Sequence, residues 1–159
     1  MLNVEQLRAD IIRPACDGLR KWTQSAENLL VLTAAVESRL GTYIRQKGNG
    51  PALGIFQMEP ATHDDIWRNY LTYKPDLAAM VRETAGISQD QCNAERLVWD
   101  LMYAACMARV HYMRSKYTLP GPENWKALAE YWKSAYNTPL GAGTVEHALS
   151  ACKACGVIT

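Results

Sequence analysis

The sequence predicts a mainly α-helical domain with one small β-hairpin lobe. Apolar residues recur at helical spacing along most of the chain, and capping residues flank these stretches. Only residues 42–58 change to β-forming and turn residues. The 159 residues can bury one core, and no repeat or linker divides residues 1–159, so we expect a single domain.

Two helices are expected before residue 42. The first follows Asn3, a good N-cap, and should be limited by Pro14. The second begins near Ser25 and runs through "AENLLVLTAAVESRL", with Gly41 as the residue that ends it. Because this stretch is apolar nearly all round, it should be buried.

The segment from 42 to 58 has the composition of a hairpin. "TYI" and "LGIF" are rich in β-forming residues, and "KGNG" between them is a turn signal. Pro60 then suits the first turn of a third helix, "PATHDDIWRNYL".

Four further helices are expected after residue 74. "PDLAAMVRETAG" should end at Gly86, and Ser88 with Gln91 should form a capping box ahead of the longest helix, 89–116, the hub of the fold. Pro122 should open the next helix. Thr144 should cap the last one.

Composition and charge exclude several classes of function. Seventeen basic and sixteen acidic residues leave a net charge of +1, which does not favour nucleic-acid binding. The longest apolar run, Leu29 to Val36, is too short to span a membrane, so no stable membrane insertion is expected. The N-terminus lacks the pattern of a secretory signal, so we expect synthesis in a host cytoplasm without a signal peptide.

The five cysteines give no regular disulfide framework. "CKAC" at 152–155 is a single CxxC, and His147 is the only further ligand nearby, whereas zinc needs four ligands. We therefore expect idle thiols, no metal and no cofactor.

Glu37 is the strongest candidate for catalysis. A carboxylate in the last turn of a buried helix is disfavoured in its charged form by desolvation and by the helix dipole. Both effects raise its pKa, as a general acid working near neutral pH requires. The glycine-rich segment that follows can form one wall of a cleft. The alternative is an exposed glutamate that simply ends a helix before an ordinary hairpin.

Two sequence blocks resemble a known family. "ESRLGTYIRQKGNGPALGIFQMEPAT" and "ALAEYWKSAYNTPLGAGTVEHAL" resemble the lysozyme superfamily, in particular soluble lytic transglycosylases, goose-type lysozymes and related phage endolysins. The matching positions are Glu37-Ser38, 54–58, 60–62 and Tyr136-Asn137. The resemblance covers roughly residues 25 to 150 and implies a lysozyme-like fold.

The resemblance also implies a function and a set of site residues. Glu37 would protonate the glycosidic oxygen between N-acetylmuramic acid and N-acetylglucosamine in peptidoglycan. Ser38, Gln57, Tyr136 and Asn137 would bind the substrate, the last two also holding Glu37. Tyr136 can equally be a core aromatic residue, and Asn137 a helix C-cap.

The second catalytic group is open, because no Asp or Glu lies between Glu37 and Glu59. Glu59 can position a water molecule as a second catalytic residue, or can merely favour the start of the next helix. Asp64 or Asp65 could also reach the cleft, although their helix begins facing away from it. Without a second carboxylate, a substrate hydroxyl attacks, as in lytic transglycosylases.

We therefore expect a muramidase, as a monomeric phage or prophage endolysin that acts on the cell wall after release. The alternatives are a lytic transglycosylase that forms anhydro products and a phage structural protein that keeps the fold without turnover.

Overall fold

The computed structural model describes residues 1–138 and 140–159, and these are mainly α-helical, as predicted. The helices are α1 (Val4–Gln6), α2 (Arg13–Gly18), α3 (Gln24–Ser38), α4 (Pro60–Asn69), α5 (Pro75–Ala85), α6 (Leu101–Met113), α7 (Trp125–Trp132) and α8 (Val145–Ala154). Short 3-10 and π turns lie between them: η1 (Leu7–Ile12), η2 (Lys47–Asn49), η3 (Leu71–Tyr73), η4 (Gln89–Gln91), η5 (Ala94–Val98) and η6 (Lys133–Asn137).

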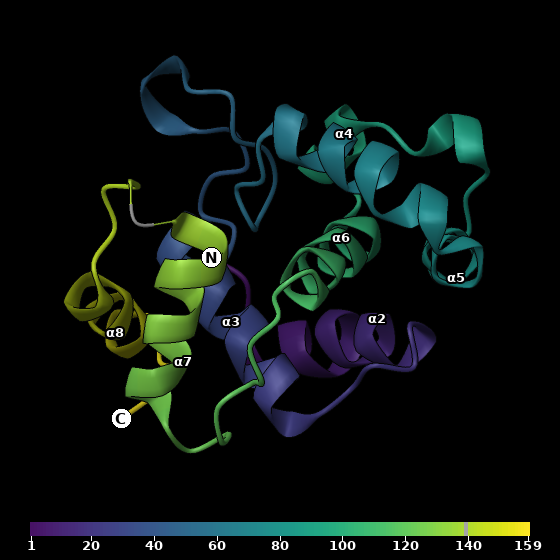
Figure 1. The fold of residues 1–159 in the computed structure, drawn as a ribbon. Helices are drawn as coiled ribbons and strands as arrows, with labels where there is room; N and C mark the ends of the chain where they lie inside the picture. The colour runs from purple at the N-terminus through teal and green to yellow at the C-terminus, as the bar shows by residue number, and fades with distance from the viewer. Residues whose placement is uncertain (139) are drawn as a thin grey trace.

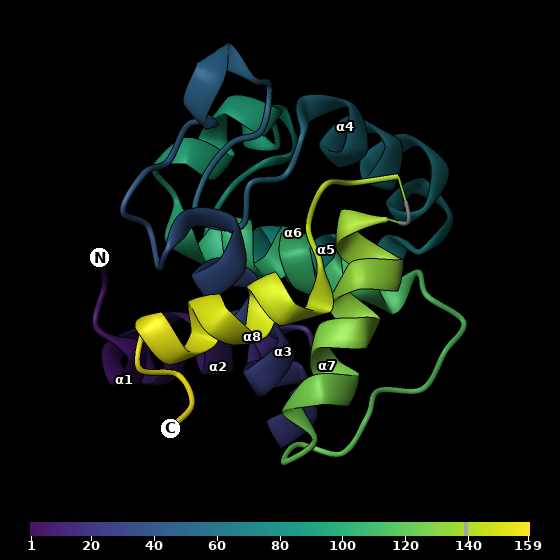
Figure 2. The same ribbon diagram turned by 90° about the vertical axis from the view of Figure 1, so that its left-hand side faces the viewer.

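Helices α3 and α6 form the centre of the core. Every residue of α6 from Tyr103 to Val110 is buried, and it packs against α2, α3 and α5 (Figure 1). Helix α3 is buried from Ala26 to Val36 and also contacts α7 and α8; in Figure 2 helix α8 passes in front of α3. The apolar character of α3 on all sides is explained by these neighbours.

The N-terminal helical segment does not stop at Pro14. The chain passes from α1 through the π turn η1 into α2, with Pro14 in the first turn of α2. In η1 the Arg13 N–H bonds the Arg8 carbonyl five residues earlier. This wider turn accommodates a proline, which has no N–H to give, so the segment continues. The cap at Asn3 forms as predicted, accepting from the Gln6 N–H.

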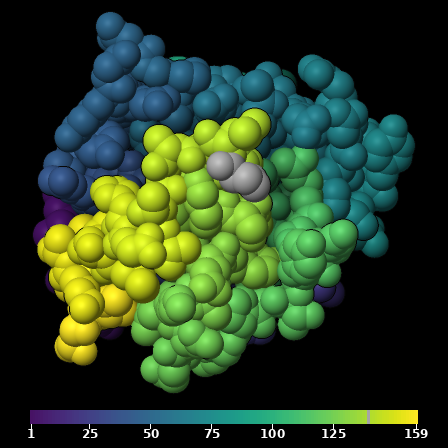
Figure 3. Space-filling view, turned by 60° about the vertical axis from the view of Figure 1, so that its left-hand side comes forward, coloured from purple at the N-terminus to yellow at the C-terminus, as the bar shows by residue number. Residues whose placement is uncertain are grey.

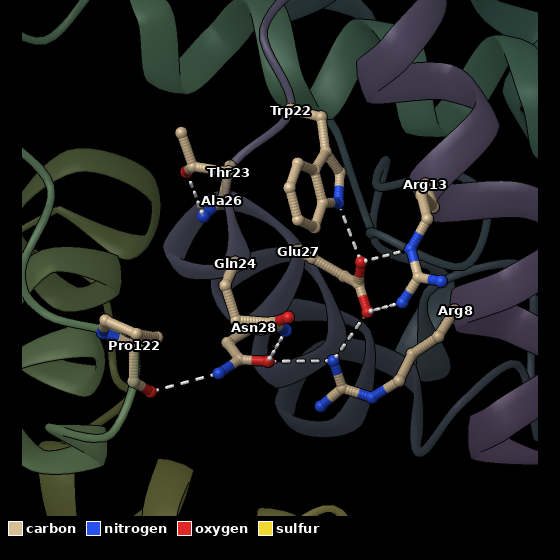
Figure 4. Close-up of polar contacts among 9 residues, drawn as sticks. All are labelled: Arg8, Arg13, Trp22, Thr23, Gln24, Ala26, Glu27, Asn28 and Pro122. Carbon is tan, nitrogen blue, oxygen red and sulfur yellow. Dashed lines mark hydrogen bonds and ion pairs between the residues drawn. The ribbon is translucent and has the colours of Figure 1, made fainter.

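A buried carboxylate ties this segment to α3. Glu27 Oε1 accepts from Arg8 at 3.1 Å, and Oε2 accepts from Arg13 at 2.9 Å and from Trp22 at 2.8 Å (Figure 4). Asn28 extends the network, since its side chain accepts from Arg8 and donates to the carbonyl of Pro122. Glu27 is thus fully paired despite being buried, as a buried charge requires.

The predicted β-hairpin does not form. Residues 42–58 contain no strand, only the turn η2 and two isolated bridges, Arg45 with Leu53 and Leu53 with Met58. All residues from 52 to 58 are buried, so the segment enters the core as an irregular loop and does not present alternating faces. Gly54 has φ +75°, and a Cβ there would lie 2.1 Å from the Leu97 carbonyl oxygen. The glycine therefore bends the loop and permits this close approach.

The predicted helix over 89–116 is also wrong in its first part. The capping box of Ser88 and Gln91 forms, but it starts only the short turn η4. Asn93 then caps η5 and Asp100 caps α6, each accepting from a backbone N–H three residues later. These two caps break the segment into separate turns before α6 begins.

The remaining helix ends follow the sequence signals more closely. Pro60 begins α4, Gly86 ends α5 in a left-handed conformation, and Thr144 caps α8. Helix α7 begins at Trp125, with Asn124 as its cap, three residues later than Pro122 suggested. Among the helices of the described residues, none is long and apolar enough to cross a bilayer.

Candidate functional site

Glu37 lies in the last turn of α3, beside α7. Its Oε1 accepts a hydrogen bond of 2.9 Å from the indole Nε1–H of Trp132. Its main-chain carbonyl accepts from the hydroxyl of Tyr43 at 2.8 Å. The side chain is only partly exposed. Oε1 is therefore held in place, while no hydrogen bond among the described residues uses Oε2.

The environment of Glu37 favours its protonated form. Burial raises its pKa from 4.5 to about 7, against the opposite effect of the Trp132 hydrogen bond. The direction agrees with the expectation from sequence. A carboxylic acid with a pKa near 7 is half protonated at neutral pH and can act as a general acid.

Glu37 opens onto a cleft of about 650 Å³. One wall is the segment from Tyr43 to Thr62, and the other is a second segment made of residues 136–138 and 141–143; His111 of α6 also lines the cleft. In Figure 3 the yellow-green surface of the second segment lies beside the blue surface of the first. Both blocks of the family resemblance therefore contribute to one cleft.

The backbone around the cleft is conformationally unusual. Five non-glycine residues in or next to its walls have positive φ: Arg39 (51°), Leu40 (53°), Asn49 (63°), Gln57 (48°) and Thr138 (69°). Each such residue costs on the order of 1–2 kcal/mol. Helix α3 consequently ends at Ser38, before the predicted Gly41, which is itself left-handed. Clusters of strained residues are typical of functional sites.

Gln57 and Tyr136 both line the cleft. The Gln57 side chain donates to the Gly54 carbonyl at 2.8 Å, which fixes its amide. The Tyr136 hydroxyl donates to the Phe56 carbonyl at 2.8 Å, so this tyrosine fastens the irregular loop to the π turn η6. The direct partner of Glu37 in the structure is Trp132, one helical turn earlier, and not Tyr136.

Asn137 also lines the cleft and is held by Lys133. The ammonium of Lys133 donates to Asn137 Oδ1 at 2.8 Å and to the Gly141 carbonyl at 2.7 Å. A Cβ on Gly141 would meet Asn137 at 2.4 Å, and one on Gly143 would meet the Trp132 ring at 2.5 Å. The two glycines therefore let this segment lie directly over Asn137 and Trp132.

Ser38 does not contact the cleft, which corrects its expected role in substrate binding. It is fully buried, donates to the carbonyls of Ala34 and Ile55, and accepts from the Gly41 N–H. Its hydroxyl joins the end of α3 to the loop that carries Gln57. Ser38 therefore positions the walls of the site.

Glu59 reaches the same cleft as Glu37 and is exposed. It is the N-cap residue of α4 but makes no capping hydrogen bond through its side chain. Asp64 and Asp65 do not line this cleft: Asp64 pairs with His63, and Asp65 with Arg114 and Asn69. Glu59 is thus the one second carboxylate that the lining of the described cleft offers.

His111 was not identified from the sequence, although it lines the cleft beside Tyr136. Its ring meets that of Tyr136 edge to face, with centroids 4.9 Å apart. Arg114 donates to its Nδ1 at 2.9 Å, which places the imidazole proton on Nε2. Burial and the charge of Arg114 lower the pKa of His111 to about 4, so it stays neutral near pH 7. The only sequence signal for His111 as a cleft residue is its position within an apolar helix.

No three His, Cys, Asp or Glu side chains within 1–138 and 140–159 lie together as a metal site would need. Comparisons of the chain with protein-family models, curated proteins and solved structures find no match.

Proposed function

We propose that the protein is a peptidoglycan-cleaving glycosidase, with a lysozyme-like arrangement of its helices and with Glu37 as the general acid. The observation that carries this proposal is a carboxyl group whose pKa is raised to about 7, held at the edge of a cleft of about 650 Å³. The family resemblance supplies the substrate, the glycan strand of peptidoglycan. The resemblance is to soluble lytic transglycosylases, goose-type lysozymes and their phage relatives, and the role proposed here is that of a phage or prophage endolysin.

The first step would use the free oxygen of Glu37. Trp132 donates to Oε1, so the acidic proton is placed on Oε2. From there it passes to the glycosidic oxygen between N-acetylmuramic acid and N-acetylglucosamine as the bond breaks. Gln57, Tyr136 and Asn137 would support the sugar rings on either side, while neutral His111 would offer an Nε2–H donor.

The second step separates hydrolysis from transglycosylation. Glu59 can activate a water molecule from its exposed position in the cleft, which would give reducing-end products. The transglycosylase alternative is favoured by one observation: no hydrogen bond among the described residues fixes the Glu59 side chain. In that reaction the muramic acid's own hydroxyl attacks, and anhydro sugars form.

The proposal is tested by digesting purified peptidoglycan and identifying the fragments by mass spectrometry. The wild type should release disaccharide fragments, and Glu37→Gln should lose about 10²–10⁴-fold of the rate while remaining folded. Glu130→Gln, which changes an exposed glutamate on α7, is the matched control and should keep full activity. Absence of fragments from folded wild type would favour the non-catalytic phage structural protein.

A further inference from the structure

A second cavity, of about 760 Å³, lies apart from the Glu37 cleft. It is formed by the turn between α2 and α3, by η3 and the start of α5, and by the end of α6 with the chain that follows. It shares no lining residue with the Glu37 cleft. On α6 its residue Arg109 and the cleft residue His111 are two positions apart, about 200° around the helix. The two cavities therefore lie on different sides of α6.

Arg109 is a buried cation on the wall of this cavity, with 8% of its surface exposed. Its Nε donates to the Lys21 carbonyl at 3.2 Å. No carboxylate of the described residues forms an ion pair with it. A buried guanidinium without an anionic partner is costly, and burial lowers the pKa of Arg109.

The terminal nitrogens of Arg109 make no hydrogen bond with the described residues. Yet no fully buried side-chain nitrogen or oxygen of the described residues lacks a partner. These nitrogens are therefore accessible from the cavity that Arg109 lines. A planar guanidinium presents such donors as a fork that matches a phosphate or carboxylate.

The charge around Arg109 favours a doubly charged anion. Arg20, Lys21 and Lys74 also line the cavity, and Asp76 is the one carboxylate in its described lining. Four cations against one carboxylate leave a formal excess of three positive charges. A phosphoryl dianion gains more from this excess than a single carboxylate does.

The mouth of the cavity carries two exposed aromatic rings. Tyr73 is 77% exposed and Tyr117 is 64% exposed, and both line the cavity. Exposed aromatic residues beside a buried cation are suited to a ligand with one apolar ring face and one anionic group. We propose that this cavity binds a phosphorylated ring compound, with Arg109 holding the phosphoryl group and the two tyrosines contacting the ring.

The test is a titration of the isotope-labelled full chain followed by two-dimensional NMR. Two probes share the proposed chemistry but differ in source, glucose 6-phosphate and adenosine monophosphate; inorganic phosphate, glucose and adenosine are the comparison ligands. At least one phosphorylated probe should give saturable shifts at residues 19–21, 70–77 and 109–119. Tighter binding of glucose 6-phosphate would indicate a phosphorylated sugar, and tighter binding of adenosine monophosphate would indicate a nucleotide.

Variants of the lining residues test whether the ligand binds in this cavity. Arg109→Lys keeps the charge but removes the fork, and should weaken binding about tenfold. Lys74→Gln changes an exposed side chain and should weaken it several-fold without affecting the fold, while Lys153→Gln, on the exposed side of α8, is the matched control and should bind as the wild type does.

Three results would overturn the proposal. The first is no saturable shift at this cavity with either probe. The second is undiminished binding in both Arg109→Lys and Lys74→Gln. The third is binding of inorganic phosphate as tight as that of both probes, which would remove the role of the ring.

Discussion

The indole N–H of Trp132 donates to Glu37 Oε1 at 2.9 Å and joins residues that are 95 positions apart in the chain. The bond has two effects on the carboxyl group. It fixes the orientation of the side chain, and it stabilises the charged form, so it keeps the pKa of Glu37 lower than burial alone would.

Trp132→Phe should therefore move the pH dependence of activity. Loss of the hydrogen bond raises the pKa of Glu37 above about 7, so the alkaline decline should move up by about one pH unit. The rate should also fall by about tenfold, because the acid is no longer oriented. A pH–rate profile measures both effects. Trp125→Phe, on the same helix, is the control, and an unchanged profile in Trp132→Phe would contradict the assigned role.

Glu37→Gln should make the protein more stable in alkaline solution. The folded-state pKa of about 7 lies above the ordinary 4.5, so the stability that Glu37 contributes is complete below pH 4.5 and is lost as the pH rises through 7. Glutamine can still accept from Trp132 but never ionises. The free energy of unfolding should thus exceed that of the wild type by up to about 3 kcal/mol at pH 9.

Thermal or urea unfolding at several pH values measures this difference. At pH 4 the two proteins should be nearly equal, because Glu37 is then neutral in both states. A constant difference at every pH would show that Glu37 titrates normally.

Glu59→Gln should identify the mechanism. If Glu59 activates water, turnover should fall by about 10²-fold or more while substrate binding survives. Near-normal turnover with anhydro products would instead assign transglycosylation. Mass spectrometry of the fragments distinguishes these results. Glu146→Gln changes another exposed glutamate at the start of a helix and should have no effect.

Gly143→Ala should disturb the orientation of Glu37 by displacing Trp132. The new methyl group would lie 2.5 Å from the Trp132 ring, so either the ring or the segment must move. We expect a loss of about 1–3 kcal/mol in the free energy of unfolding and reduced activity. Gly121→Ala, which meets no atom within 4 Å, is the control. Wild-type activity in Gly143→Ala would show that the Trp132 position is not critical.

The thiols should be largely unreactive in the folded protein. All five cysteines are free; Cys16, Cys106 and Cys152 are fully buried, and Cys155 is nearly so. Burial raises the pKa of Cys16 and of Cys152 to about 12. A thiol reagent should therefore modify mainly Cys92 in the native protein and all five after denaturation. Melting temperatures with and without reductant should agree within a few degrees; a large drop under reduction would reveal a disulfide.

Helix existence was predictable from sequence where capping and proline signals agree with the apolar pattern. This holds for α4, α5 and α8, which begin or end at Pro60, Gly86 and Thr144. The prediction of a hairpin was wrong because the β-forming residues at 52–58 are all buried. Burial on every side favours an irregular loop over paired strands with one exposed face. The prediction of one long helix was wrong because the side chains of Asn93 and Asp100 accept hydrogen bonds from backbone N–H groups three residues later and so start new turns.

The site was predictable only in part. Glu37, Gln57, Tyr136 and Asn137 line one cleft, and local position or resemblance was enough to select them. Trp132 and His111 could not be selected, because their importance depends on contacts between distant segments. Ser38 was placed in the binding site because it follows Glu37, but the left-handed turn at 39–41 directs its hydroxyl into the core.

Helix α3 carries a carboxylate near each end, and the two respond to pH in opposite ways. Burial raises the pKa of Glu27, but its bonds to Arg13, Trp22 and Arg8 outweigh this effect and lower the pKa below 4.5. The stability from Glu27 is therefore present above pH 4.5 and is lost as acid protonates it, whereas that from Glu37 is lost as base ionises it. The combined contribution of these two carboxylates to the folding free energy therefore has a bell-shaped dependence on pH, with its maximum in mildly acidic solution. On the alkaline side, the pH at which stability declines is also the pH at which the proposed acid loses its proton.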